Sequence, residues 1–232
     1  MENQLYVGVS KEIITPEIGA HLFGYNPFLI AEGIADDLNA TAFVLKYDDV
    51  VSVMVSADVA CIDIPLADRI RKEIEKECNI PFENIMLSAT HTHSGPATIS
   101  YPGVGKADEK YVDNVFIAGI KKAVKDAYES MEPVKVGIAV GESYVGVNRR
   151  VILEEENAIF GQCPWAPLDP KMTVVSFRNL DGKTVGNMVH YAAHGTAAGA
   201  NKEFTRDWPG YMVDRLEYVS GGITGFFNGW EG

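Results

Sequence analysis

The segment Ala89-Thr90-His91-Thr92-His93-Ser94-Gly95-Pro96 decides how the rest of the chain is interpreted. It follows a short apolar run, Asn84–Ser88, whose length and bounds predict a buried strand. Residues two apart in an extended segment share a face, so His91 and His93 are expected side by side, and Ser94–Pro96 should end the strand. Such imidazoles can share a metal ion, or one can bind the metal while the other acts as a general acid or base. Two structural histidines on a strand edge are the alternative.

A second histidine pair lies in the segment His190-Tyr191-Ala192-Ala193-His194-Gly195-Thr196, again at the end of an apolar run. Two strands that each end in a histidine before a glycine-containing break can build a metal site at one sheet edge. His190 and His194 share a face on either a strand or a helix, so their spacing alone does not identify the ligand. A packed strand position is the simpler interpretation of His190, and His21, in a loop, is expected at the surface.

Composition excludes several classes of function. The chain has 232 residues, 47% of them hydrophobic, which is enough for a sizeable core in one large domain or two small ones. Its formal net charge of -12 argues against a nucleic-acid partner and against docking on an anionic membrane surface. No apolar run approaches the roughly 20 residues of a membrane-spanning helix. No signal peptide is recognised, so we expect a cytoplasmic protein, with a secreted parent as the alternative.

The hydrophobic pattern predicts a mixed β-sheet with flanking helices, an α/β domain spanning residues 1–232. We expect strands at 5–14, 41–46, 51–56, 134–140, 172–177 and 185–191, and helices at 65–78, 108–131 and 209–219. Tyr47–Asp49 and Asn179–Gly182 should turn two hairpins. Long loops are expected at 17–37 and 153–170, with a polar turn at 146–150, and long loops of this kind often surround a site.

Other catalytic motifs are missing from the sequence. It has no G-x-S-x-G elbow, no H-E-x-x-H helix and no phosphate-binding loop. Cys61, Cys78 and Cys163 are widely spaced, which predicts neither a disulfide framework nor a thiolate metal site. Asp207 precedes a predicted helix, where a helix N-cap is the simplest role.

Several of these segments resemble the neutral/alkaline non-lysosomal ceramidase family, N-terminal domain. The His-Thr-His-Ser-Gly-Pro block at 91–96 is the most specific match, and the supporting landmarks occur in family order over essentially the whole chain: Val7–Val9, Ile14–Pro16, Gly24-Tyr25, Ser56–Asp58, Asn148-Arg149 and Ala192–Thr196. The resemblance implies a zinc amidohydrolase that cleaves the N-acyl bond of ceramide, giving sphingosine and a fatty acid.

The resemblance also implies roles for individual residues. His91 and His194 match zinc ligands, and His93 and Arg149 match active-site residues that hold substrate oxygens or water. His190 matches a position that is usually aromatic. The candidate substrate-binding residues are Tyr25, Asp58 and Asp207, and the aromatic loop around Tyr25 could line a slot for an acyl chain or simply pack in the core.

The sequence departs from the family pattern near Gly232. The family supplies a glutamate, a tyrosine and a Gly-Asp-x-Ser-Pro-Asn serine further along, and 228–232 resemble the lead-in to that segment. We therefore expect the N-terminal part of a longer catalytic domain. Two histidines alone should bind zinc weakly, because zinc sites normally take three or more protein ligands, and this chain by itself should show little or no amidase activity. Two alternatives stay open: a cytosolic zinc hydrolase of another amide or ester, and a non-catalytic fragment or binding module.

Overall fold

The computed structural model describes residues 4–26, 28–103, 105–153 and 157–230. Its centre is an eight-stranded sheet in the order β14-β12-β11-β8-β1-β4-β5-β6, in which β12–β14 and β5–β6 are parallel pairs and the other neighbours are antiparallel. The strands are β1 (Leu5–Ile13), β4 (Asn39–Tyr47), β5 (Val50–Ala57), β6 (Ile85–Ala89), β8 (Glu132–Glu142), β11 (Lys171–Asn179), β12 (Thr184–Tyr191) and β14 (Ile223–Asn228). The mixed α/β prediction is confirmed.

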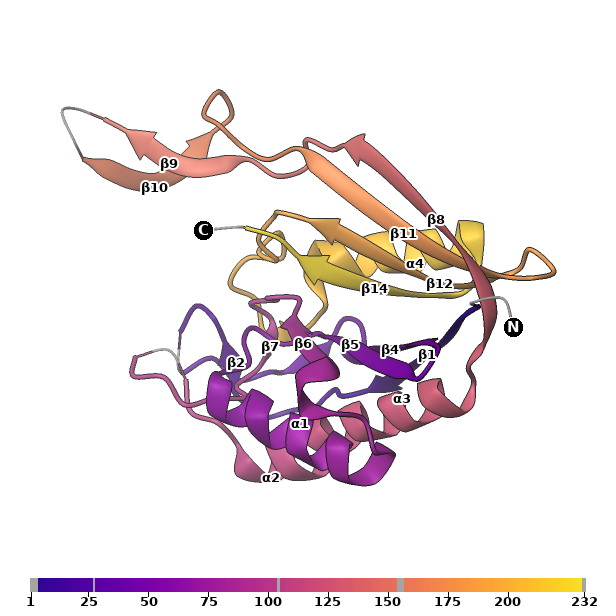
Figure 1. The fold of residues 1–232 in the computed structure, drawn as a ribbon. Coiled ribbons are helices and arrows are strands. Elements are labelled where there is room, and N and C mark those ends of the chain that lie inside the picture. Colours follow the sequence, from indigo (N-terminus) through magenta and orange to yellow (C-terminus); the bar gives the residue numbers. More distant parts are fainter. Residues whose placement is uncertain (1–3, 27, 104, 154–156, 231–232) are drawn as a thin grey trace.

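The sheet curls so that its two ends face each other (Figure 1). Ser56 Oγ on β5 donates to the Phe226 carbonyl on β14, and Asn228 Nδ2 donates to the Thr90 carbonyl at 3.1 Å. Apolar side chains from both halves fill the space between them, among them Val7, Phe43 and Phe227. The curl brings the ends of β6 and β12 together although about 100 residues separate them.

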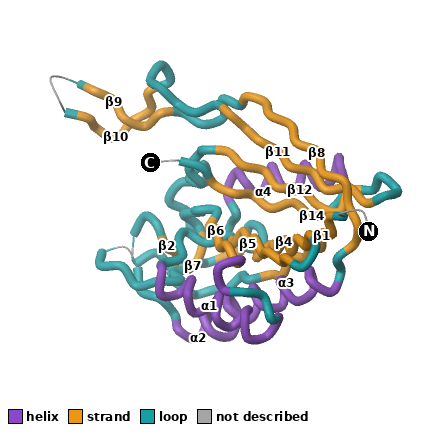
Figure 2. Tube along the Cα trace, viewed as in Figure 1, coloured by secondary structure: helices purple, strands orange, loops and turns teal. Residues whose placement is uncertain are grey.

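Helices cover the outer side of each half of the curled sheet (Figures 1 and 2). The helices α1 (Ile64–Cys78) and α3 (Ala118–Glu129) cover one face, and α4 (Asp207–Ser220) covers β12 and β14. Helix α1 begins at the Asp63 cap, whose carboxylate accepts from Leu66 N at 3.0 Å, and ends at Asn79 in the left-handed conformation.

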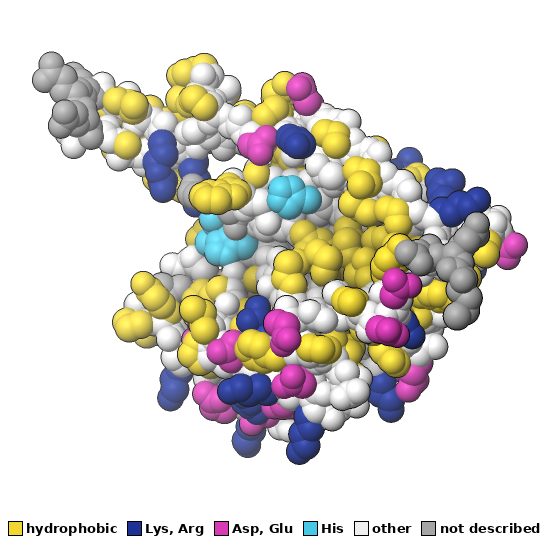
Figure 3. All heavy atoms as spheres, in the orientation of Figure 1, with side chains coloured by type: hydrophobic (Ala, Val, Ile, Leu, Met, Phe, Trp, Pro, Cys, Tyr) yellow, Lys and Arg dark blue, Asp and Glu magenta, His cyan; other side chains and the backbone are white. Residues whose placement is uncertain are grey.

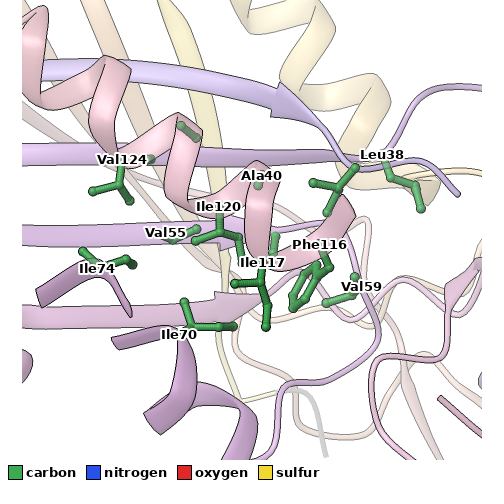
Figure 4. Packing of buried hydrophobic residues seen from close by; sticks show 14 of the residues in the cluster. Leu38, Ala40, Val55, Val59, Ile70, Ile74, Phe116, Ile117, Ile120 and Val124 are labelled. Carbon is green, nitrogen blue, oxygen red and sulfur yellow. The ribbon is translucent and has the colours of Figure 1, made fainter. Parts of the chain in front are cut away.

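The main core lies between the helices α1 and α3 and the strands β4 and β5. Ile70 and Ile74 of α1 meet Ile120 and Val124 of α3 over Val55 (Figure 4). These side chains are fully buried, and truncating one of them to alanine is expected to cost about 2–5 kcal/mol of stability. The rigid layer that results supports the loops after β5 and β6.

Most predicted elements agree with the structure, including both hairpin turns and the helices expected at 65–78 and 108–131. The second of these helices is α2 (Glu109–Tyr111) and α3 joined through a π-helical stretch, η2 (Val112–Ile117). A 3-10 turn, η1 (Phe82–Asn84), precedes β6. Within the described residues, no helix has the length and apolar character needed to cross a membrane.

Two predictions about the loops are wrong. The polar turn at 146–150 and the long loop at 153–170 contain β9 (Asn148–Ile152) and β10 (Ala158–Cys163), a hairpin that projects from the body as an arm (Figure 1). The residues 154–156 lie outside the described part. The Gly95–Pro96 segment does not end a strand but forms β7, which pairs with β2 (Leu22–Phe23). Another short pair joins β3 (Gly33–Ile34) to β13 (Glu203–Phe204).

Candidate metal centre and cleft

Three histidines meet where the ends of β6 and β12 come together. His93 Nε2 lies 3.3 Å from His91 Nε2 and 3.1 Å from His194 Nε2. The rings of His91 and His194 have centroids 4.4 Å apart, and the three ligand nitrogens lie within 4.8 Å of one another. Nitrogens about 2.1 Å from one tetrahedral zinc would lie about 3.4 Å apart, so the spacing fits a single metal ion.

His91 reaches this position through an unusual backbone conformation, and not as part of a strand. Strand β6 ends at Ala89, and His91 has φ 62°, in the left-handed region. Its amide donates to the Val59 carbonyl at 3.0 Å and its Nδ1 lies 2.5 Å from the Ala60 carbonyl. A carbonyl only accepts, so Nδ1 carries the proton and Nε2 presents its lone pair to the other histidines. The expected meeting of His91 and His93 is confirmed, but the shared strand face is not its cause.

His93 is packed against the loop that precedes β3. A Cβ on Gly24, which has φ 131°, would lie 2.7 Å from His93 Cγ, so only glycine fits beneath the ring. Tyr25 stands edge-on to the same ring at a centroid distance of 5.1 Å. Burial, with smaller contributions from His91 and Arg149, lowers the pKa of His93 to about 4. The ring is therefore neutral at pH 7, which suits a hydrogen-bond donor to a developing negative charge.

His194 is held by the backbone of the neighbouring histidine loop. His93 N donates to the Gly195 carbonyl at 3.1 Å, and Thr92 and Gly195 form a parallel bridge. A Cβ on Gly195 would lie 3.0 Å from the His91 carbonyl oxygen, which explains why glycine follows His194. The indole Nε1 of Trp208 donates to the His194 carbonyl at 2.9 Å.

A cleft of about 1160 Å³ opens in front of His93 and His194, between the body and the arm. Figure 3 shows histidine side chains in the hollow beneath the arm. Arg149 projects from β9 into this cleft, its Nε buried without a hydrogen-bond partner and its guanidinium carbon 5.7 Å from the centre of the Phe160 ring. A cation therefore shares the cleft with His93 and His194.

Tyr25 lines the same cleft as Arg149. Its hydroxyl lies 3.5 Å from the Thr196 carbonyl oxygen. Burial, with a contribution from Asp207, raises the pKa of Tyr25, so the phenol stays protonated at neutral pH. The structure thus brings together five of the predicted site residues: His91, His93, His194, Arg149 and Tyr25.

The other two predicted site residues lie elsewhere. Asp58 lines a separate small cavity with Lys11 and Arg206, and its carboxylate accepts from Asn39 N at 2.9 Å. Asp207 is 2% exposed and is taken up by hydrogen bonds to backbone amides, a geometry that does not present it to the cleft. The prediction that Asp207 is the N-cap of a helix is also wrong. Arg206 occupies the N-cap position of α4, and Asp207 is the first residue of that helix.

Of the remaining histidines, neither joins the metal-binding group. His190 lies on β12 and His21 in the loop before β2, and both are exposed. The prediction that His190 is not a ligand agrees with this placement, whereas a packed position for it is wrong. The surface position of His21 is confirmed.

Some lining residues of the cleft carry no sequence motif. Phe160 is 76% exposed and Trp230 is 97% exposed, and both line the cleft together with Val145, Val147 and Leu168. Aromatic residues in a loop without hydrophobic period are the only sequence signal for such a surface. The Ala60 carbonyl, which orients His91, has no signal at all because any residue supplies it.

The fold and the site together define a mixed α/β protein with a three-histidine centre capable of holding a metal ion beside a largely apolar cleft. Imidazole nitrogens suit zinc as well as copper, iron and nickel. A family model described as neutral/alkaline non-lysosomal ceramidase, N-terminal, matches residues 5–221. The chain belongs to this family.

Individual relatives agree with the family. A neutral ceramidase of Oryza sativa is 25% identical over 227 residues, which cover 88% of this chain and 29% of the relative. The neutral ceramidase of Pseudomonas aeruginosa is 28% identical over 150 residues, covering 62% of this chain and 22% of the relative. The chain thus spans less than a third of the length of these curated relatives.

Two solved structures share the fold over 97% of this chain. A ceramidase complexed with C2 has a TM-score of 0.82 at 26% identity, and the neutral ceramidase from Pseudomonas aeruginosa has a TM-score of 0.80 at 25% identity. The match covers 37% and 38% of those chains. The predicted family resemblance is confirmed.

Proposed function

We propose that this protein is a zinc-dependent amidohydrolase that cleaves the N-acyl linkage of ceramide-like lipids to a sphingoid base and a fatty acid. The observation that carries the proposal is the convergence of three imidazole nitrogens, 3.1 and 3.3 Å apart, at the edge of a cleft of about 1160 Å³. The family and its ceramidase relatives supply the substrate class.

Hydrogen bonding distinguishes His91 from His93. Metal-binding histidines usually donate a hydrogen bond from the N–H of their second ring nitrogen to a carbonyl or carboxylate oxygen, which fixes the ring. His91 has such an acceptor in Ala60, whereas His93 Nδ1 is buried with no hydrogen-bond partner. We therefore assign the zinc to His91 and keep His93 for the substrate, and we take His194 as the second ligand because the family resemblance implies that role.

When bound, a zinc ion supplies Lewis acidity, which polarises a carbonyl and acidifies water. In hydrolysis, the oxygen of water adds to the amide carbon, the carbon–nitrogen bond breaks, and the nitrogen leaves with a proton. His93, neutral and facing the ligand nitrogens, donates an N–H to the carbonyl oxygen as it becomes negative. The Arg149 guanidinium and the protonated Tyr25 hydroxyl lie at the same opening and hold the polar head of the substrate.

The lining of the cleft suits a lipid. The apolar part of the lining consists of Val145, Val147, Phe160, Leu168 and Trp230. A site of this kind recognises hydrocarbon by burying it while a few polar groups fix its orientation. An acyl chain along these residues would leave its amide beside His93 and His194, which line the same cleft.

The test is to measure zinc content and fatty-acid release from an N-acyl-sphingosine by the purified full-length protein, which includes the later segments that the family uses to complete its site. The proposal expects bound zinc and fatty acid released together with sphingosine. Zinc with hydrolysis of simple amides or esters but none of the ceramide would favour a different zinc hydrolase. Neither zinc nor hydrolysis would identify a non-catalytic module and contradict the proposal.

A further inference from the structure

We propose that Asp207 is a positioning residue for the metal centre, which it serves by fixing the loop that carries His194. This inference rests on the proposed function, since it assigns His194 as a metal ligand. Asp207 acts through backbone amides and touches neither metal nor substrate.

The carboxylate of Asp207 organises the backbone on both sides of it. Its Oδ1 accepts from Ala197 N at 2.9 Å and from Trp208 N at 2.7 Å, and its Oδ2 accepts from Ala198 N at 2.7 Å. The side chain is 2% exposed, and charge-assisted hydrogen bonds of this kind are stronger than neutral ones. The loop that follows His194 is thus tied to the start of α4.

The residues around Asp207 also contact both histidine loops directly. Trp208 Nε1 donates to the His194 carbonyl at 2.9 Å, and Thr92 Oγ1, between His91 and His93, donates to the Thr205 carbonyl at 2.7 Å. Thr205 N donates to the Ser94 carbonyl at 3.1 Å. The short segment Thr205–Trp208 therefore joins the loop of His91 and His93 to the loop of His194.

This segment is itself firmly anchored. Arg206 Nε lies 2.7 Å from Asp36 Oδ1, and its two terminal nitrogens reach the Asp214 carboxylate at 3.0 and 2.8 Å. The Arg206 side chain is 9% exposed in this arrangement. A planar guanidinium paired on two sides holds the backbone on the N-terminal side of Asp207 in one orientation.

The chemistry of the position explains why aspartate is needed. Asp207 has φ 59°, a left-handed conformation that Asp and Asn tolerate better than most residues. Asparagine offers one acceptor oxygen and places an NH2 group opposite a backbone N–H, so it can replace only part of the hydrogen bonding. Alanine replaces none of it. The expected order of metal affinity is Asp, then Asn, then Ala.

The experiment titrates Co2+ into the apo wild-type chain and into Asp207→Asn and Asp207→Ala, reading the dissociation constant and the visible absorption spectrum. Replacing an outer-shell partner typically weakens metal binding about 10–100-fold, and we expect a loss in this range for Asp207→Asn with a changed spectrum. Circular dichroism and thermal melting establish that each variant is folded. Ile74→Val, in the core between α1 and α3, is the control for a general loss of stability and should bind Co2+ as the wild type does.

A second variant keeps the inference testable if the Asp207 variants do not fold. Trp208→Phe keeps an aromatic ring but removes the N–H that reaches the His194 carbonyl, and we expect weaker Co2+ binding from it as well. Equal Co2+ affinity and spectrum in the wild type and the folded variants would overturn the inference alone. A wild-type chain that binds no Co2+ would overturn the proposed metal centre and the inference with it.

Discussion

At the scale of single residues, the site depends on close backbone approaches that leave no room for side chains. Gly24 lies under the His93 ring, and Gly195 lies against the backbone of His91 and Thr92. A methyl group at either place would displace an imidazole by a fraction of an ångström or more. Both glycines therefore belong to the site although neither carries a functional group.

The first prediction concerns Gly24→Ala. The variant adds a Cβ 2.7 Å from His93 Cγ and places alanine at φ 131°, so the ring must move. We expect turnover of an N-acyl-sphingosine to fall by about 10²-fold, the scale of losing one donor to the oxyanion. Zinc content should stay near that of the wild type, because His91 and His194 are untouched. The matched control is Gly182→Ala, which also has positive φ but open space around it; unchanged turnover in Gly24→Ala would contradict the account.

A second residue-scale prediction follows from Asp58. Burial raises the pKa of this carboxyl to about 6 from an ordinary value of 3.8. Below pH 3.8 both the folded and the unfolded chain hold the proton; between the two values the unfolded chain has lost it while the folded chain keeps it. The stability contributed by protonated Asp58 is therefore lost as the pH rises from about 4 to about 6.

Asp58→Asn removes this titration. The free energy of unfolding of the variant relative to the wild type should rise by about 2 kcal/mol between pH 4 and pH 7, because one pKa unit corresponds to about 1.4 kcal/mol. Denaturant unfolding at several pH values measures the difference, with Asp181→Asn at an exposed position of the turn between β11 and β12 as control. A difference that does not change with pH would show that the Asp58 pKa is not raised.

At the scale of elements, the hairpin of β9 and β10 contributes the cation Arg149 and the aromatic ring of Phe160 to the cleft. Arg149 and Phe160 lie on its two strands and stack at 5.7 Å. The arm thereby places a positive charge in the cleft without drawing on the core. The cation–π contact with Phe160 helps to hold the Arg149 guanidinium in place.

The third prediction separates these two arm residues. Arg149→Ala should lower turnover by about 10²-fold while zinc content stays unchanged, because the guanidinium holds substrate and not metal. Phe160→Ala should lower kcat/KM only about two- to fivefold, since an exposed cation–π contact contributes about 0.5–1 kcal/mol. Rates measured beside zinc content test both. A loss of zinc in Arg149→Ala, or a larger effect of Phe160→Ala than of Arg149→Ala, would contradict this division of roles.

Elements also show how far the sequence could predict the fold. Strands such as 51–56 and helices such as 65–78 carry a local hydrophobic period, and each was predicted within a few residues. The arm was not, because Asn148–Ile152 and Ala158–Cys163 are largely exposed and have no buried face to produce alternation. The parallel pairing of β12 with β14 depends on the chain returning through α4, which local patterns do not encode.

The candidate site, like the fold, was predictable where a local motif marks the residues and not where tertiary contacts place them. The two histidine motifs indicated candidate ligands, and the family resemblance singled out His91 and His194 among them and added Arg149 and Tyr25. The left-handed backbone at His91, the Ala60 carbonyl and the place of Asp207 depend on tertiary contacts, so no motif could reveal them. For Asp58 the sequence misleads. Its match to a family landmark predicts a substrate-binding residue, but the side chain lines a small cavity that is separate from the cleft.

At the scale of the whole molecule, the curl of the sheet creates the site by joining β6 to β12. Metal binding should therefore stabilise the entire fold, because the ligands come from loops about 100 residues apart and an unfolded chain cannot hold them together. Zinc at 100 times its dissociation constant should add about 2.7 kcal/mol to the free energy of unfolding. Thermal melting with zinc and with a chelator measures this shift, and His21→Ala, at an exposed site, should show the same shift as the wild type. A melting temperature that zinc does not change would argue against a single site between the loops.

The central claim is that His91 and His194 hold the metal while His93 acts on the substrate. Its most direct test is the zinc content of His91→Ala and His93→Ala, each purified as the full-length enzyme, determined beside their rates of fatty-acid release. We predict that His91→Ala loses both zinc and activity, and that His93→Ala keeps most of its zinc yet loses about two to three orders of magnitude in turnover. Loss of zinc from His93→Ala with retention in His91→Ala would reverse the assignment, and retention by both variants would show that the three histidines are structural.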